Sequence, residues 1–243
     1  WLAGVEHPES WVKQEFLTGP SYSIEVIGDG EQYRTFEITE LEMDAGFDCK
    51  RVMAQVPLSK ELAAALEDTA LTLARSLRLT GIMDVEVILH QGQLKVLEID
   101  ARFPSQTPTV VYHSSGINLV EALWHGDRDG FCSNPPATAR GVIYEHILVA
   151  GQSLSVCGEH IMAGAGPLAV HHDFFGAQEA LTNYRPGRTT WVATLIMVGQ
   201  DLGKATALRD KVLANIRQSC GITTYSDTAP AVMPQRKKQS IAA

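Results

Sequence analysis

The chain has 243 residues, of which 28 are Asp or Glu and 20 are Lys or Arg, giving a formal net charge of −8. This acidic balance argues against a nucleic-acid partner, because such proteins usually present a basic surface. No apolar run approaches the roughly 20 residues that a membrane-spanning helix needs, so we expect no membrane partner. The four cysteines lack the spacing of a zinc site or a disulfide framework, and we expect reduced thiols in a cytoplasmic protein.

The first part of the chain is rich in short β-type segments. Residues 11–17 are a short, mostly apolar run, and residues 22–27 predict a strand. A Gly-Asp-Gly sequence at 28–30 favours a hairpin turn, because Gly and Asp tolerate positive φ. We expect the second strand of this hairpin over 33–38 and another short strand over 53–56.

Residues 59–79 carry the clearest helical pattern of the sequence. Ser59 can accept a hydrogen bond from the first turn, and Glu61 lies where the helix dipole favours a negative charge. Apolar residues recur at steps of three and four, which predicts one buried stripe. The members of this stripe are Leu62, Leu66, Ala70, Leu73 and Leu77.

A second hairpin is expected directly after this helix. Its strands are predicted over 82–89 and 94–99, around a His-Gln-Gly-Gln turn. The following segment, 102–116, is rich in Pro, Ser and Thr, and we expect no regular helix there because two prolines interrupt it. A short helix is predicted over 117–124.

The second half of the chain begins after a polar, proline-containing segment at 127–137, which is a candidate domain boundary. Strands are expected over 142–150 and 190–198. Residues 201–220 predict an amphipathic helix that stops before a glycine, and the basic tail at 234–239 is expected to be disordered.

Acidic residues alternate along both strands of the second hairpin. Asp84 and Glu86 share one face of the first strand, and Glu98 and Asp100 share one face of the next, because strand side chains alternate sides. Pairing would bring the four carboxylates together, and a hard cation such as Mg²⁺ would offset their repulsion. Arg102, one strand step further, suits a phosphate or acyl-phosphate oxygen. The alternative is a hairpin whose acidic face is only solvated.

This pattern resembles the metal site of ATP-grasp ligases, where an acidic residue on one strand precedes a Glu-x-Asn/Asp pair on the next. The resemblance covers most of residues 11–125 and implies that ATP and Mg²⁺ are bound. It implies that Asp84, Glu98 and Asp100 hold the metal, with Glu86 as a weaker candidate on the same face.

The same resemblance implies roles for residues outside the acidic cluster. Arg102 matches a phosphate-contacting position, and Lys50 falls loosely where many of these ligases carry a phosphate-contacting lysine. Ser21 departs from the pattern, since many members have an acidic ribose-binding residue there. One segment resembles the hinge that offers backbone groups to adenine. Its residues are Gln14, Glu15, Phe16 and Leu17.

Three longer runs, 81–86, 98–109 and 114–119, are similar to one branch of these ligases, which acts in pyrrolysine biosynthesis. This similarity implies that ATP phosphorylates the carboxylate of 3-methyl-D-ornithine and that the side-chain amine of L-lysine then displaces phosphate to form an amide. The residues expected to contact the amino acids are Ser23, Glu25, Asp48, Ser105 and Thr107.

The predicted fold class is α+β. We expect the C-terminal half of an ATP-grasp fold over 1–126, an antiparallel sheet with flanking helices, then a small α/β domain over 127–232 and a tail over 233–243. The resemblance also implies an N-terminal nucleotide-binding-like domain and a phosphate lid, which we expect as missing parts of the same enzyme. A homodimer is left open.

Two other functions stay open as alternatives. One is another ATP-grasp amino-acid ligase, similar to D-alanine–D-alanine ligase or carbamoyl-phosphate synthetase. The other is a binding fragment without activity of its own. Among the remaining residues, His171 and His172 are expected on a surface loop, because neighbours on a strand would point to opposite faces. Cys49 is expected to have a packing role.

Overall fold

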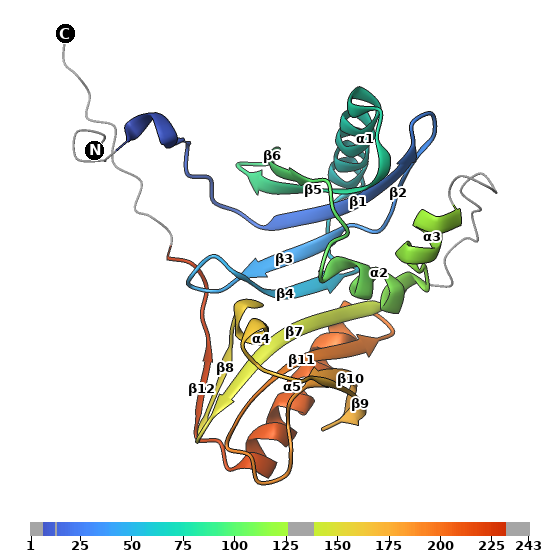
Figure 1. The fold of residues 1–243 in the computed structure, drawn as a ribbon. Helices are drawn as coiled ribbons and strands as arrows, with labels where there is room; N and C mark the ends of the chain where they lie inside the picture. The colour runs from blue at the N-terminus through green and yellow to red at the C-terminus, as the bar shows by residue number, and fades with distance from the viewer. Residues whose placement is uncertain (1–6, 13, 126–138, 232–243) are drawn as a thin grey trace.

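Twelve strands form one twisted sheet in the computed structural model, which describes residues 7–12, 14–125 and 139–231 (Figure 1). The main order is β6-β5-β1-β3-β4-β7-β11-β10-β9, with β2 paired to β1 and β8 to β7. All these pairs are antiparallel, whereas β12 lies parallel to β8. The strands are β1 (Ser21–Asp29), β2 (Tyr33–Thr35), β3 (Thr39–Met43), β4 (Cys49–Ala54), β5 (Thr80–His90), β6 (Gln93–Asp100), β7 (Gly141–Ala150), β8 (Ser153–Val156), β9 (Ala169–Phe174), β10 (Ala177–Thr182), β11 (Thr190–Gly199) and β12 (Thr224–Asp227).

Helices flank this sheet at both ends, which confirms the predicted antiparallel sheet with flanking helices (Figure 1). One long helix packs on β1 and β2, and another packs on β7, β10 and β11. None of the helices in the described ranges combines the length and apolar character that crossing a membrane requires. The helices are α1 (Lys60–Leu77), α2 (Thr107–Ser115), α3 (Leu119–His125), α4 (His160–Ala163) and α5 (Leu202–Cys220), with a 3₁₀ turn at Pro8–Ser10.

Helix α1 begins and ends much as its sequence predicts. The Ser59 hydroxyl accepts a hydrogen bond from the Leu62 amide at 3.3 Å, which satisfies one of the free N–H groups of the first turn. Leu66 and Ala70 of the predicted stripe are fully buried, but Leu77 is 60% exposed. At the end of the helix the buried position is Ala74 and not Leu77, because the helical period is 3.6 residues.

Strand β1 lies in the interior of the sheet and is buried on both faces. On one face Ile24 packs with Leu66 of α1, and on the other Ile27 packs with Leu119 of α3. Full burial of one aliphatic side chain contributes about 1.5–3 kcal/mol, so these two clusters fix the strand firmly. The strand in turn carries polar side chains to a defined position in the centre of the sheet.

Several sequence expectations about local structure were wrong, among them the surface loop expected at His171 and His172, which lie in β9. Residues 107–115 form helix α2, although the prolines of this segment predicted irregular chain. Pro108 lies in the first turn of α2, where the missing N–H is not needed and the fixed φ suits a helix. Strand β3 was not foreseen, and β4 begins at Cys49 and not at Met53.

The later strands join the earlier ones in the same sheet. Strand β7 pairs with β4 on one side and β11 on the other, so strands from both expected domains lie next to each other. The candidate boundary at 127–137 lies outside the described residues, as does the tail over 233–243. Helix α5 is capped by Asp201, which accepts from the Lys204 amide at 2.8 Å, and it ends at Gly221 with φ of 65°.

Candidate active site

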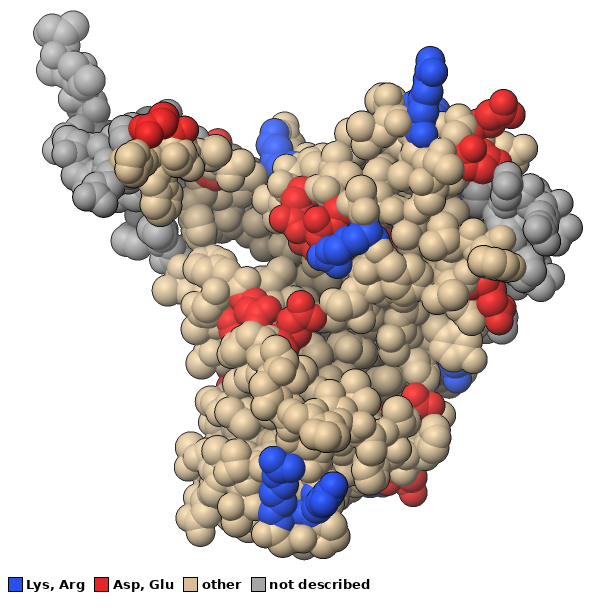
Figure 2. Space-filling model, in the orientation of Figure 1, with Lys and Arg blue, Asp and Glu red and all other residues tan. Residues whose placement is uncertain are grey.

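Four carboxylates face one another across the β5–β6 hairpin. Asp84 lies opposite Asp100 and Glu86 opposite Glu98 in the antiparallel register. Asp84 is 3% exposed, and one of its carboxylate oxygens has no hydrogen-bond partner. Figure 2 shows acidic side chains gathered beside a basic one on the upper part of this face, above a hollow. The alternation predicted from the sequence therefore places these four groups in one cluster.

Burial and mutual repulsion change the acidity of the two carboxylates on β5. Burial, followed by the charge of Asp100, raises the pKa of Asp84 to about 6. Burial, followed by the charge of Glu98, raises the pKa of Glu86 to about 7. Arg102 forms an ion pair with Asp100 and is itself more than half exposed. The single charge of Arg102 does not neutralise the four carboxylates of the hairpin. Their oxygen atoms are therefore suited to bind a hard divalent cation.

A third strand extends this polar surface. On β1, Glu25 lies opposite Asp84 and Ser23 opposite Glu86. Glu25 is fully buried with both carboxylate oxygens unpartnered, and burial raises its pKa to about 7. The hydroxyls of Ser23 and Thr107 are also buried without a partner. Buried polar groups are normally hydrogen-bonded, so this group of side chains is suited to a polar or cationic ligand.

The loop between β6 and α2 borders the same cavity and is held from the second half of the chain. Glu159 accepts hydrogen bonds from the Ser105 hydroxyl at 3.1 Å and from the Gln106 amide at 2.7 Å. Arg102 and Thr107 line this cavity together with Asp84 and Glu86. The loop is therefore fixed at one end by Glu159 and continues at the other into the acidic hairpin.

A second cavity, of about 400 Å³, lies beside the segment before β1. Residues 15–19 form one side, and Ile88 and Leu97 of the hairpin form another. The rings of Phe16 and Phe47 meet edge to face with centroids 6.0 Å apart. This lining combines the backbone of residues 15–19 with apolar side chains, which suits a flat heteroaromatic ring.

Glycine at position 19 allows the segment before β1 to approach β5 closely. A Cβ at Gly19, whose φ is 154°, would lie 2.0 Å from the carbonyl oxygen of Leu89. The Leu89 amide donates to the Pro20 carbonyl at 2.9 Å, and the Thr18 amide donates to His90 Nδ1 at 3.2 Å. The segment is thus attached to the hairpin that carries the carboxylates.

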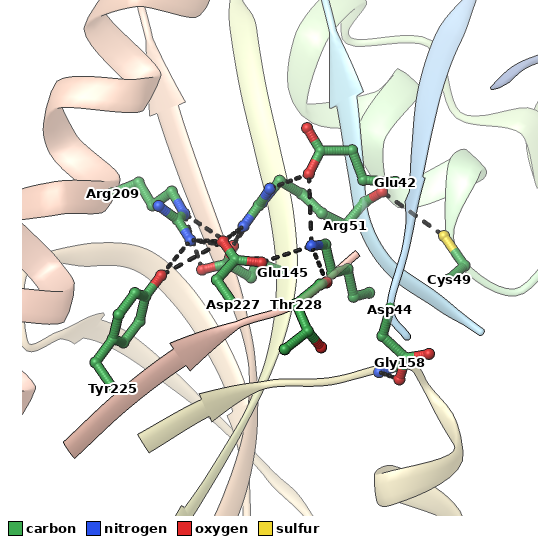
Figure 3. Close-up of polar contacts among 11 residues, drawn as sticks. Glu42, Asp44, Cys49, Arg51, Glu145, Gly158, Arg209, Tyr225, Asp227 and Thr228 are labelled. Atoms are coloured by element: carbon green, nitrogen blue, oxygen red, sulfur yellow. Dashed lines mark hydrogen bonds and ion pairs between the residues drawn. The ribbon is translucent and has the colours of Figure 1, made fainter. Parts of the chain in front are cut away.

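The structure does not bring Lys50 to the carboxylates, contrary to the expected phosphate contact. A β-bulge pairs Glu42 with Arg51 and Met43 with Cys49, which leaves Lys50 as the extra residue of β4. Cys49 lines the cavity beside the carboxylates, whereas Lys50 is buried and points to the opposite face of the sheet. Its Nζ donates to Asp227 Oδ1 and to the Thr228 carbonyl, both at 2.6 Å. Figure 3 labels these two acceptors.

Asp48, predicted to contact an amino-acid substrate, is hydrogen-bonded within the protein. Its carboxylate accepts hydrogen bonds from the His160 backbone N–H at 2.9 Å and contacts His160 Nδ1 at 2.5 Å. Nearby, the Asp44 carboxylate accepts a hydrogen bond from the Gly158 backbone N–H at 2.9 Å. These contacts attach the loop between β3 and β4 to the turn before α4.

The comparison with protein families identifies the first part of this assembly. Residues 3–106 match the family model described as ATP-grasp domain. This part of the chain is thus similar to an ATP-grasp domain. The matched range contains both the segment before β1 and the acidic hairpin, and the match agrees with the resemblance seen in the sequence.

Curated relatives match nearly the whole chain. It is 36% identical over 211 residues to 3-methyl-D-ornithine--L-lysine ligase of Methanosarcina mazei, which covers 86% of this chain and 54% of the relative. It is 34% identical over 224 residues to the ligase of the same name from Methanosarcina barkeri, covering 90% of this chain and 58% of the relative. The chain therefore spans about half the length of the curated relatives it matches.

Solved structures share the ATP-grasp fold at low sequence identity. A biotin carboxylase from Campylobacter jejuni superposes with a TM-score of 0.62 at 14% identity, over 83% of this chain and 47% of that one. An L-amino acid ligase from Bacillus licheniformis superposes with a TM-score of 0.56 at 15% identity, over 82% of this chain and 54% of that one. These likenesses extend the fold assignment beyond residue 106.

Several residues that line these two cavities could not be found from the sequence. Glu159 and Gln106 border the cavity, and Phe47, Pro230 and Ala231 line the second one. Glu159, Pro230 and Ala231 stand in no motif, because each reaches its site through contacts between distant segments. Gln106 lies within the run 98–109, but that run implied no role for it. Of the residues predicted for the adenine hinge, Glu15, Phe16 and Leu17 line the second cavity, but Gln14 does not.

Proposed function

We propose that the protein is an ATP-dependent ligase that joins a carboxylate to an amine, and that this chain supplies its metal site and adenine pocket. The observation that carries the proposal is the facing of Asp84 and Glu86 with Glu98 and Asp100, beside Arg102. Such a cluster is unfavourable without a cation, and Mg²⁺ with ATP phosphates is the ligand that it fits.

The residues of this chain would position ATP and neutralise its charge. Residues 15–17 would offer backbone groups to the adenine edge, while Phe16 and Phe47 cover its faces. Arg102, exposed at the rim of the cavity, would hold oxygens of the transferred phosphoryl group. Mg²⁺ held by the hairpin carboxylates would supply positive charge where negative charge develops on the phosphates.

The amino-acid substrates would bind between the hairpin and α2. We propose 3-methyl-D-ornithine as the acyl donor and L-lysine as the amine, in pyrrolysine biosynthesis, because the curated relatives carry those substrates in their names. Both substrates have ammonium groups, and the buried carboxylate of Glu25 beside Ser23 and Thr107 would hold one of them. In the overall reaction ATP phosphorylates the carboxylate, and the amine then displaces phosphate to give the amide.

The remaining part of the enzyme would complete the ATP site. The matches cover only 54% and 58% of these two curated relatives, so we propose that the nucleotide-binding-like domain and the phosphate lid belong to the remaining part of the enzyme. No group of this chain needs to form a covalent intermediate, because positioning and charge neutralisation are enough for this chemistry.

The proposal is tested with the full-length protein, ATP, Mg²⁺, D-ornithine and L-lysine. We expect ADP release that depends on both amino acids and an amide product detected by mass spectrometry, with no stimulation by D-alanine. Glu98→Gln is expected to lower this rate at least tenfold and to raise the Mg²⁺ requirement. Glu67→Gln, the same change on the exposed face of α1, is the matched control.

Two results would contradict the proposal in different ways. Stimulation by D-alanine but not by lysine would assign another ATP-grasp amino-acid ligase. Unchanged Mg²⁺ dependence in Glu98→Gln would reject the metal site on the hairpin.

A further inference from the structure

The adenine pocket has a wall that comes from the far end of the described chain. Pro230 and Ala231 line the 400 Å³ cavity together with residues 15–19, Phe47 and Leu97. These two residues follow β12, the last strand, and belong to no helix or strand themselves. The polar contacts nearest to them along the chain are made just before them, by Asp227 and Thr228.

Lys50 contacts both Asp227 and Thr228. Its Nζ donates to Asp227 at the end of β12 and to the carbonyl of Thr228, both at 2.6 Å (Figure 3). Lys50 is 4% exposed, so its ammonium group is committed to these partners and to Glu42 at 4.0 Å. We call Lys50, Asp227 and the Thr228 carbonyl the C-terminal clamp.

Other charges hold the clamp from the opposite side. Arg51 and Arg209 contact the second oxygen of Asp227, at 2.6 and 3.0 Å. Both arginines also contact Glu145, which is fully buried on β7. Asp227 thus receives hydrogen bonds on both carboxylate oxygens from elements that belong to the rigid sheet and to α5.

We propose that Lys50 is a positioning residue for nucleotide binding, which acts by holding residues 228–231 as the far wall of the adenine pocket. This inference rests on the proposed function, because it takes the 400 Å³ cavity as the adenine site. It replaces the phosphate contact expected from the sequence, since Lys50 lies on the sheet face opposite the carboxylates.

The energetic reason is preorganisation. With the clamp in place, four residues after β12 are ordered before the base arrives. Without it, the base must order them on binding, and this cost is subtracted from the affinity. We expect the loss of the clamp to weaken base binding about tenfold.

The decisive measurement compares adenosine with ATP in the full-length protein. Lys50→Met should weaken the binding of both ligands by the same factor, because the wall contacts the base that they share. L-Lysine binding should be unchanged, which a general loss of structure would not allow. Lys211→Met, on the exposed face of α5, is the matched control. Weaker ATP binding with unchanged adenosine binding would overturn the proposal and restore the phosphate contact.

A second variant keeps the test decisive if Lys50→Met does not fold. Asp227→Asn removes the charge that Lys50 contacts, leaves the pocket lining unchanged, and should weaken adenosine and ATP equally. If neither variant changes adenosine binding while Phe47→Ala abolishes it, the clamp is rejected and the adenine pocket stands. If the wild-type protein binds no adenosine, or Phe47→Ala leaves its binding unchanged, the adenine pocket of the proposed function fails as well.

Discussion

Asp84→Asn is expected to make the ligand-free protein more stable while it removes the response to Mg²⁺. Asp84 is 3% exposed, faces Asp100 and Glu25 on the neighbouring strands, and has an unpartnered carboxylate oxygen. Burial and the charge of Asp100 raise its pKa from 3.8 to about 6. The ionised carboxylate therefore destabilises the folded state, and this destabilisation amounts to about 3 kcal/mol.

The sign of the effect fixes its pH dependence. Because the folded-state pKa lies above the unfolded value, the penalty is complete above about pH 6 and disappears as the pH falls toward 4. Asparagine has a similar shape and carries no charge, so the variant avoids the penalty at every pH. A gain of about 3 kcal/mol corresponds to a rise of about 6–12 °C in the unfolding temperature of a domain this size.

Thermal unfolding without metal, at pH 8 and at pH 4, measures this prediction directly. The variant should unfold at a higher temperature than the wild type at pH 8 and at nearly the same temperature at pH 4. Adding Mg²⁺ and ATP should stabilise the wild type and leave Asp84→Asn nearly unaffected. Asp68→Asn, on the exposed side of α1, should change neither result. A variant that is less stable at pH 8, or whose advantage persists at pH 4, would refute this reasoning.

Three further predictions concern stability and are measured by urea unfolding. Glu145→Gln should lower the free energy of unfolding by about 3–5 kcal/mol, because Arg51 and Arg209 lose the negative charge that they contact. An unchanged urea midpoint would mean that solvent screens these charges. Gly158→Ala should lower the free energy of unfolding by about 1–3 kcal/mol, since its Cβ would lie 2.2 Å from the Asp48 carboxylate. Gly164→Ala, whose Cβ would meet open space, should leave the free energy of unfolding unchanged. Ser59→Ala should lower the free energy of unfolding by about 1 kcal/mol, because helix α1 loses its N-cap hydrogen bond. Ser76→Ala within the same helix should lower it by less than half as much.

The helix and hairpin that matter most for the site could be predicted because their signals are local. The stripe of α1 and its Ser59 cap follow from the helical period. The acidic hairpin follows from the two-residue alternation of strands and a turn of two central residues. Helix α2 was missed because proline was read as a breaker, although it fits the first turn of a helix.

The location of Lys50 shows where sequence reasoning fails. A strict alternation along β4 would place Lys50 and Arg51 on opposite faces. The β-bulge adds one residue to the strand, so both cations reach the same carboxylates. Nothing in the sequence marks this bulge, because it arises from how β3 and β4 pair.

By itself, the sequence determined the ATP-grasp resemblance, the α1 helix and the four carboxylates of one hairpin. Only the tertiary structure decided that Glu25 lies opposite Asp84 and that Pro230 closes the pocket begun by Phe16. The physical reason is the range of the interactions. Alternation and capping depend on neighbours a few residues apart, whereas strand register and ion pairing join segments that the chain brings together only on folding.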